Sequence, residues 1–233
     1  MRILSDTGPQ VSRFRPVYLM HEVGVEQAHV QAVLDATYAV LRAAGIERRV
    51  EVNNFGVWRN CHWHEGNRLL NWQSVDWYVA DALRASRNDH QLHGGRLMAL
   101  LYNEPWQEAK PHYDIVVTNR DMYDDDCSFV IGLAVHGLGT VISTNRFLGL
   151  DARAQRECII TETMHEVGHV FGLVPGDRTD NVEESLGLHC TNKCIMRQGL
   201  NVPHDWIKIT NDRLAGHEFC NACQRDLRRF FCH

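Results

Sequence analysis

Apolar residues recur along this chain with two spacings, and each spacing predicts a different kind of element. Between residues 26 and 44, Val30, Val33 and Leu41 lie at helical intervals and Gly45 follows, so we expect a helix that ends there. Short runs of apolar and β-branched residues bounded by turn residues predict strands instead. The same reasoning predicts further helices at 74–87, 151–172 and 214–230, and strands at 17–23, 49–52, 96–102, 114–118, 129–135 and 139–144.

The helix expected at 151–172 carries the run HEVGHVFG at residues 165–172. Residues four apart on a helix are offset by about 40° around the axis and about 6 Å along it, so His165 and His169 can reach one zinc ion at about 2.0 to 2.1 Å. Glu166 points to the side of that ion, within reach of a zinc-bound water whose pKa falls to about 7. The run predicts a hydrolytic zinc site with two ligands and a general base.

A second group of metal-binding residue types follows downstream, as HCTNKCIM at 189–196 and CNAC at 220–223. Cysteines in CxxxC and CxxC pairs are typical of structural zinc, although disulfides or a redox CxxC remain alternatives. The chain has eight cysteines. We interpret the other four as buried or unpaired thiols: Cys61, Cys127, Cys158 and Cys232.

The chain resembles the archaemetzincins over about residues 110–223. The resemblance rests on four motifs in order: HExxHxxG, His-Cys, a second Cys followed two residues later by Met, and CxxC. Archaemetzincins are zinc peptidases of the metzincin clan with an extra cysteine-bound zinc. The resemblance implies an α+β, α/β/α-like fold: a mixed twisted sheet with helices, an active-site helix carrying HExxH, and a smaller C-terminal lobe. It implies two zinc ions per chain. The roles implied are His165, His169 and His189 as catalytic zinc ligands, Glu166 as base, Met196 in the Met-turn, and Cys190, Cys194, Cys220 and Cys223 as ligands of the structural zinc.

The chain departs from the archaemetzincin pattern at the third histidine. In the family this histidine comes three residues after the glycine, where Pro175 stands here, and residues 173–188 intervene before His189. We favour His189 as the third ligand because it abuts Cys190 as the motif requires, and Asp177 is the alternative, since carboxylate also binds zinc. The insert is polar and rich in turn residues, so we expect an exposed loop that flanks the cleft.

Composition and charge indicate one domain and argue against a membrane protein or a nucleic-acid-binding protein. The chain has 233 residues, 44% of them hydrophobic and 23% charged, which suffices for one catalytic domain over 1–233 with subdomains 1–172 and 173–233. No apolar run is long enough to span a membrane, and the first residues do not resemble a signal peptide, so we expect a cytoplasmic protein. The sequence does not determine the oligomeric state, and we favour a monomer. The net charge of −5 and the lack of a basic cluster argue against a nucleic-acid partner.

The sequence therefore predicts a zinc-dependent metallopeptidase that acts on a peptide or protein substrate. Two alternatives stay open. One is a catalytically silent zinc-binding protein of the same fold, which the intact Glu166 argues against. The other is a zinc hydrolase that is not a peptidase, because HExxH specifies water activation and not the bond that is cleaved.

Overall fold

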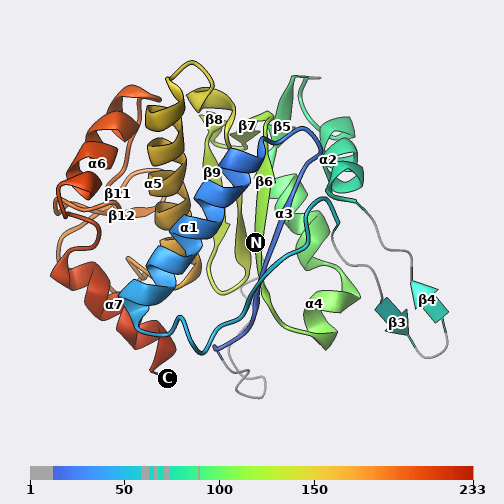
Figure 1. The fold of residues 1–233 in the computed structure, drawn as a ribbon, viewed down its shortest axis with the longest axis horizontal. Coiled ribbons are helices and arrows are strands. Elements are labelled where there is room, and N and C mark those ends of the chain that lie inside the picture. The colour runs from blue at the N-terminus through green and yellow to red at the C-terminus, as the bar shows by residue number, and fades with distance from the viewer. Residues whose placement is uncertain (1–12, 59–62, 66–67, 71–73, 89, 233) are drawn as a thin grey trace.

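A twisted five-stranded sheet forms the centre of the molecule (Figure 1). The computed structural model describes residues 13–58, 63–65, 68–70, 74–88 and 90–232. Strands β2, β1, β6 and β10 run parallel, and β9 pairs antiparallel with β10 at one edge. In sheet order the strands are β2 (Val52–Asn54), β1 (Val17–His21), β6 (Tyr113–Thr118), β10 (Gly139–Ser143) and β9 (Gly132–Val135).

Helices cover both faces of this sheet. Successive side chains of a strand point to opposite faces, and on β6 the side chains of Ile115 and Val117 join one apolar cluster whereas Val116 joins the other. The first cluster contains the inner faces of α1 (Gln27–Ala44) and α5 (Ala152–Val170), and the second those of α2 (Val75–Arg84) and α3 (Gly94–Tyr102). The result is a three-layer α/β/α arrangement, which confirms the α+β fold predicted from the sequence.

Smaller elements complete the fold. Two hairpins, a three-stranded sheet and two C-terminal helices surround the central layers (Figure 1). Their bounds are β3 (Trp63–Glu65), β4 (Arg68–Leu70), β5 (Gln91–His93), α4 (Pro105–Ala109), β7 (Asp121–Asp124), β8 (Cys127–Val130), a 3-10 turn at Asn145–Phe147, β11 (Val182–Glu184), β12 (Leu188–Cys190), α6 (His204–Leu214) and α7 (Asn221–Phe231).

Four predicted elements are wrong in type or extent, and one of them is the strand expected at 49–52, which lies at Val52–Asn54 as β2. The strand expected at 96–102 is helix α3, in which Leu97, Met98 and Leu101 are buried at helical intervals. Short apolar runs do not distinguish a strand from a buried helix, and Leu, Met and Ala favour the helix. The helix expected at 214–230 begins only at Asn221, as α7, because α6 ends at Leu214 and Gly216 has φ +93°, a left-handed conformation that glycine adopts without steric cost.

The strand predicted at 129–135 is also divided. β8 ends at Val130 and pairs with β7, whereas β9 begins at Gly132 and joins the central sheet. Within the insert, β11 pairs antiparallel with β12, so 173–188 is partly a hairpin and not only a loop.

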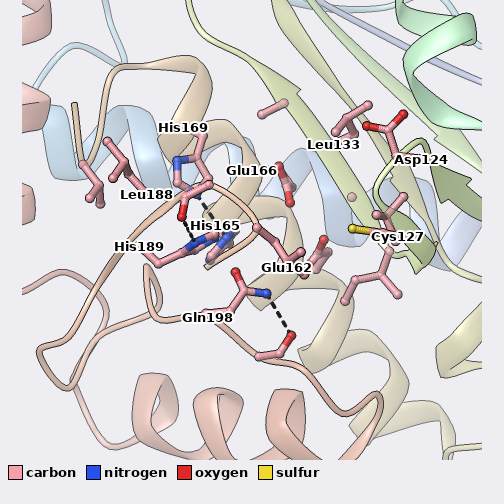
Figure 2. A pocket seen from close by; sticks show the side chains of 18 of the residues that line it. Asp124, Cys127, Leu133, Glu162, His165, Glu166, His169, Leu188, His189 and Gln198 are labelled. Atoms are coloured by element: carbon pink, nitrogen blue, oxygen red, sulfur yellow. Dashed lines mark hydrogen bonds between the residues drawn. The ribbon is translucent and has the colours of Figure 1, made fainter. Parts of the chain in front are cut away.

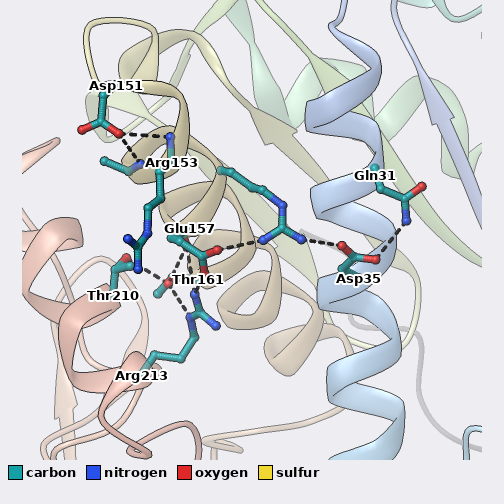
Figure 3. A network of polar contacts seen from close by, with 10 residues as sticks. Gln31, Asp35, Asp151, Arg153, Glu157, Thr161, Thr210 and Arg213 are labelled. Carbon is teal, nitrogen blue, oxygen red and sulfur yellow. Dashed lines mark hydrogen bonds and ion pairs between the residues drawn. The ribbon is translucent and has the colours of Figure 1, made fainter.

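Polar contacts hold α5 between its neighbours (Figure 3). The side chain of Asp151 caps the helix by accepting from the backbone N–H of Arg153 and Ala154, both at 3.0 Å. Arg156 donates to Asp35 on α1 at 2.6 Å. On the other side, Arg213 of α6 forms an ion pair with Glu157, and Thr210 donates to Thr161 at 2.9 Å. These ties fix the helix that presents the HExxH run.

The segment after residue 172 packs on the same core as α1 and α5. Ile195, Met196, Phe230 and Phe231 belong to one apolar cluster with the sheet. The division into subdomains 1–172 and 173–233 stays a prediction. Among the described residues, no helix is both long and apolar enough to cross a membrane.

Candidate metal centres

Three histidines converge on one point at the wall of a pocket (Figure 2). His165 and His169 lie one turn apart on α5, and His189 lies on β12. Nε2 of His165 and Nε2 of His169 are 3.2 Å apart, and the ligand nitrogens of all three lie within 4.8 Å of one another. Nitrogens at two corners of a tetrahedral zinc site are about 3.3 Å apart, given Zn–N distances of about 2.0 to 2.1 Å. The spacing fits one zinc ion.

Backbone carbonyls orient two of these imidazole rings. Nδ1 of His165 donates to the carbonyl of Ile195 at 2.8 Å, and Nδ1 of His189 donates to that of Gly187 at 3.2 Å. A carbonyl only accepts, so each bond places the ring proton on Nδ1 and leaves the Nε2 lone pair for a metal. Zinc-binding histidines usually donate their other ring N–H to such an acceptor, which fixes the orientation of the ring.

Burial keeps the imidazoles neutral. Desolvation, followed by the nearby His189, lowers the pKa of His165 to about 3. Desolvation also lowers the pKa of His169 well below its usual value and that of His189 in the same direction. Neutral imidazole is the form that binds a metal, so the site is prepared for one at neutral pH.

Two glutamates one turn apart on α5 lie beside the histidines (Figure 2). Glu166 is 8% exposed and Glu162 is fully buried. Burial raises the pKa of Glu166 to about 8, and burial together with the charge of Glu166 raises that of Glu162. Two adjacent buried carboxyl groups do not both ionise readily, so in the metal-free protein this pair holds a proton at neutral pH.

Edge strand β9 passes so close to these glutamates at Gly132 that a larger side chain there would displace one of them. A Cβ added to Gly132 would lie 2.3 Å from Oε1 of Glu162 and 2.7 Å from Oε1 of Glu166. We expect Gly132→Ala to lower the free energy of unfolding by about 1 to 3 kcal/mol, as overpacking does, and to displace Glu166. Exposed Gly149 has no atom within 4 Å of its Cβ position, so Gly149→Ala is the matched control. Denaturant unfolding of both variants tests this, and equal stability would contradict the close approach.

Met196 lies directly under the histidine-bearing turn of α5. Its side chain is fully buried, and a Cβ added to Gly168 would lie 2.7 Å from the Met196 sulfur. Gly168 stands between His165 and His169 in the chain, so this small residue allows the methionine to pack below the metal-binding face.

Four cysteines form the second candidate centre. Sγ of Cys190 is 3.7 Å from Sγ of Cys220, and Sγ of Cys194 is 3.8 Å from Sγ of Cys223. Sulfurs at two corners of a tetrahedral zinc site are about 3.8 Å apart, given Zn–S distances of about 2.3 Å, whereas disulfide sulfurs are about 2.05 Å apart. The spacing fits a tetrahedral zinc site and not two disulfides.

The remaining candidates lie elsewhere. Asp177 is on the surface in an ion pair with Arg229 at 2.5 Å and does not join the histidines, an arrangement that favours His189 as third ligand. Cys127, Cys158 and Cys232 are free thiols, as the sequence predicts. Cys61 lies outside the described residues.

The pocket has two facing walls above the histidines (Figure 2). Residues 132–134 of edge strand β9 form one wall, and residues 186–189 at the end of the insert form the other. Gln198 and Trp206 also line the pocket, and within the described part of the chain the buried Oε1 of Gln198 and Nε1 of Trp206 have no hydrogen-bond partner.

Two site residues were not predicted from the sequence. Glu162 precedes Glu166 by one helical turn, a spacing that could have indicated a carboxyl pair. Arg178, whose side chain contacts the cysteine cluster, has no local signal, because it reaches sulfurs from residues 12 and 45 positions later in the chain.

Comparison with known proteins identifies a family whose match covers both candidate centres. The family model described as Peptidase family M54 matches residues 112–229, which contain every candidate ligand of both centres. The chain belongs to peptidase family M54. The resemblance to archaemetzincins is thereby confirmed.

The chain is also similar to archaemetzincins in sequence and in fold. This chain is 35% identical to the archaemetzincin of Archaeoglobus fulgidus over 113 residues, which cover 48% of this chain and 58% of the relative. It is 34% identical to the archaemetzincin of Methanopyrus kandleri over 143 residues, which cover 58% of this chain and 70% of the relative. The chain thus spans about half the length of several curated M54 relatives. The M. kandleri crystal structure shares the fold with TM-score 0.64 and 19% identity over 97% of this chain and 99% of that one.

Proposed function

We propose that this chain is a zinc-dependent peptidase that hydrolyses peptide bonds at the three-histidine site. The observation that carries the proposal is the convergence of His165, His169 and His189 beside Glu166 in the wall of an open pocket, in a chain of the M54 family. We propose those histidines as ligands of a catalytic zinc and the four cysteines as ligands of a structural zinc.

The proposed chemistry divides between the metal and the chain. When bound, zinc supplies a Lewis acid that polarises the scissile carbonyl and makes a water molecule more acidic. Glu166 takes the proton of the attacking water and transfers it to the leaving amine. A cation at the histidines would favour ionised Glu166, because an opposite charge lowers a carboxyl pKa. Glu162 holds the proton of the pair while Glu166 acts as the base.

The pocket walls suit an extended peptide. An edge strand can pair with a peptide through main-chain hydrogen bonds, which do not depend on the peptide sequence. β9 is such an edge and its residues line the pocket next to Glu166. We propose that substrate binds along β9 and that the insert closes the opposite side.

The direct test is cleavage of a mixture of unstructured peptides by the purified full chain, followed by mass spectrometry. We expect cleavage that stops after removal of zinc by a chelator and returns when zinc is restored. Absence of cleavage by a chain that holds zinc at the histidines would contradict the proposed reaction. The cytoplasmic location, monomeric state and lack of a nucleic-acid partner stay predictions.

A further inference from the structure

One buried arginine attaches the insert at 173–188 to the cysteine cluster. The Arg178 side chain is 3% exposed. Its Nη1 donates to Sγ of Cys223 at 3.3 Å, and its Nη2 donates to Sγ of Cys190 at 3.2 Å. A single guanidinium therefore contacts two of the four proposed zinc ligands.

The other donors of this guanidinium hold the insert and α7. Nε of Arg178 donates to the carbonyl of Asp180 at 2.8 Å, and Nη2 also donates to that of Asn181 at 3.1 Å. Nη1 pairs with Oδ2 of Asp226 on α7 at 2.9 Å. The same Oδ2 accepts the backbone N–H of Val174 at 3.2 Å, so α7 holds the start of the insert as well.

Charge explains why an arginine occupies this position. Four thiolates and one Zn²⁺ together carry a charge of −2, and a buried charge is costly unless it is paired and hydrogen-bonded. Arginine stays ionised and presents several donors in a fixed plane, which allows simultaneous bonds to two sulfurs. Arg178 therefore gains most from the cluster when a metal keeps all four sulfurs as thiolates.

The insert needs such an external tie because its backbone is locally unfavourable. Val174 and Leu186 both adopt φ 53°, in the left-handed region that residues with a β-branched or bulky side chain avoid, whereas Asn181, at φ 52°, is a residue type that tolerates it. Two of these residues take part directly in the ties, since Val174 bonds to Asp226 and Asn181 bonds to Arg178.

The tie extends to the proposed catalytic site through the hairpin. Glu183 of β11 pairs with His189 of β12, and the backbone N–H of Thr191 donates to the carbonyl of Asn181 at 3.1 Å. Leu186 and Gly187, between the two strands, and Leu188, the first residue of β12, line the pocket. Anything that positions the insert therefore positions the third histidine and one pocket wall.

We propose that Arg178 is a positioning residue that anchors the insert to the cysteine-bound zinc and thereby fixes His189 and the pocket wall at 186–188. The zinc at the cysteines then controls the geometry of the histidine site, because the insert at 173–188 links the two centres. The inference rests on zinc at the cysteines and not on peptide hydrolysis, so it can be tested whatever reaction the chain catalyses.

The test compares Arg178→Met and Arg178→Lys with Arg229→Met in the full, zinc-loaded chain. Arg229 is the matched control because its ion pair with Asp177 also joins α7 to the insert, but it is exposed and, among the described residues, forms no hydrogen bond to a sulfur. Two quantities are measured: the rate of zinc release from the cysteines to a chromogenic chelator, and amide hydrogen exchange across 173–190.

We expect Arg178→Met to release cysteine-bound zinc about tenfold faster than the parent, as loss of a partner of metal ligands usually does, and to speed exchange across the insert. Arg178→Lys keeps the positive charge but lacks the planar guanidinium, so its rate of zinc release and its insert exchange should lie between those of the parent and those of Arg178→Met. Arg229→Met should stay within about twofold of the parent, because exposed ion pairs contribute little. Parental zinc release in Arg178→Met, or faster release with unchanged exchange of the insert, overturns the inference.

A second variant keeps the test valid if Arg178→Met does not fold. Cys220 accepts from Asn192 at 3.3 Å and lies outside the Arg178 contacts, so Cys220→Ser weakens the metal site while Arg178 remains. We expect insert exchange to accelerate in this variant too. An insert as protected as in the parent after cysteine zinc is lost would show that the metal does not anchor it. A parent that holds no cysteine zinc would instead refute the proposed structural zinc.

Discussion

Replacing Glu166 by Gln is expected to lower peptide hydrolysis by about a thousandfold, within the range of about 10² to 10⁴ that a positioned base contributes. The amide has nearly the same shape as the carboxyl group but cannot take a proton from water. It also leaves the three imidazoles intact. Zinc content should therefore remain at the parental value while kcat falls, which steady-state kinetics and metal analysis of the same sample would show.

Glu184→Gln is the matched control for that variant. Glu184 lies on β11 and is exposed, so the same substitution there should leave kcat unchanged within about twofold. A Glu166→Gln enzyme that retains a tenth or more of parental kcat would exclude Glu166 as the base. Loss of zinc in that variant would show instead that the carboxyl group supports metal binding.

The double variant Cys194→Ser, Cys223→Ser should have the largest effect on stability. Both side chains are fully buried and their sulfurs lie 3.8 Å apart, a tetrahedral edge. Structural zinc in small peptides contributes about 10 to 16 kcal/mol of apparent binding free energy at neutral pH, which is comparable with the entire stability of a domain, about 5 to 15 kcal/mol. We therefore expect the 173–233 segment to lose its fixed structure.

Thermal unfolding followed by circular dichroism, with zinc analysis, measures this effect. Cys232→Ser provides the control, because Cys232 is exposed and does not belong to the cluster. The control should unfold at the parental temperature. A double variant that also does so would show that the cysteines contribute no metal-dependent stability.

The residues of the histidine centre differ in how far sequence could predict them. His165, Glu166 and His169 follow from local spacing, because one helical turn fixes their relation. His189 does not, since residues 173–188 separate it from the helix and only the β11–β12 pairing returns it to the site. The adjacent Cys190 provided the signal through the family motif.

Other features depend on contacts between distant parts of the chain. Glu162 stands one helical turn before Glu166, a local relation, but its close contact with β9 at Gly132 is one that no local pattern encodes. Arg178 reads as a loop residue until Cys190 and Cys223 are placed around it. The helix α3 was missed for a local reason, because its apolar run suits either type of element.

Zinc content of the purified full chain, before and after removal of two histidines, tests the central claim most directly. The account predicts two zinc ions per parental chain, and one in the double variant His165→Ala, His169→Ala, with the remaining ion held by the cysteines. The double variant should keep parental hydrogen exchange across α7. A parent with a single zinc, or a double variant that still holds two, would contradict the assignment of two separate metal centres.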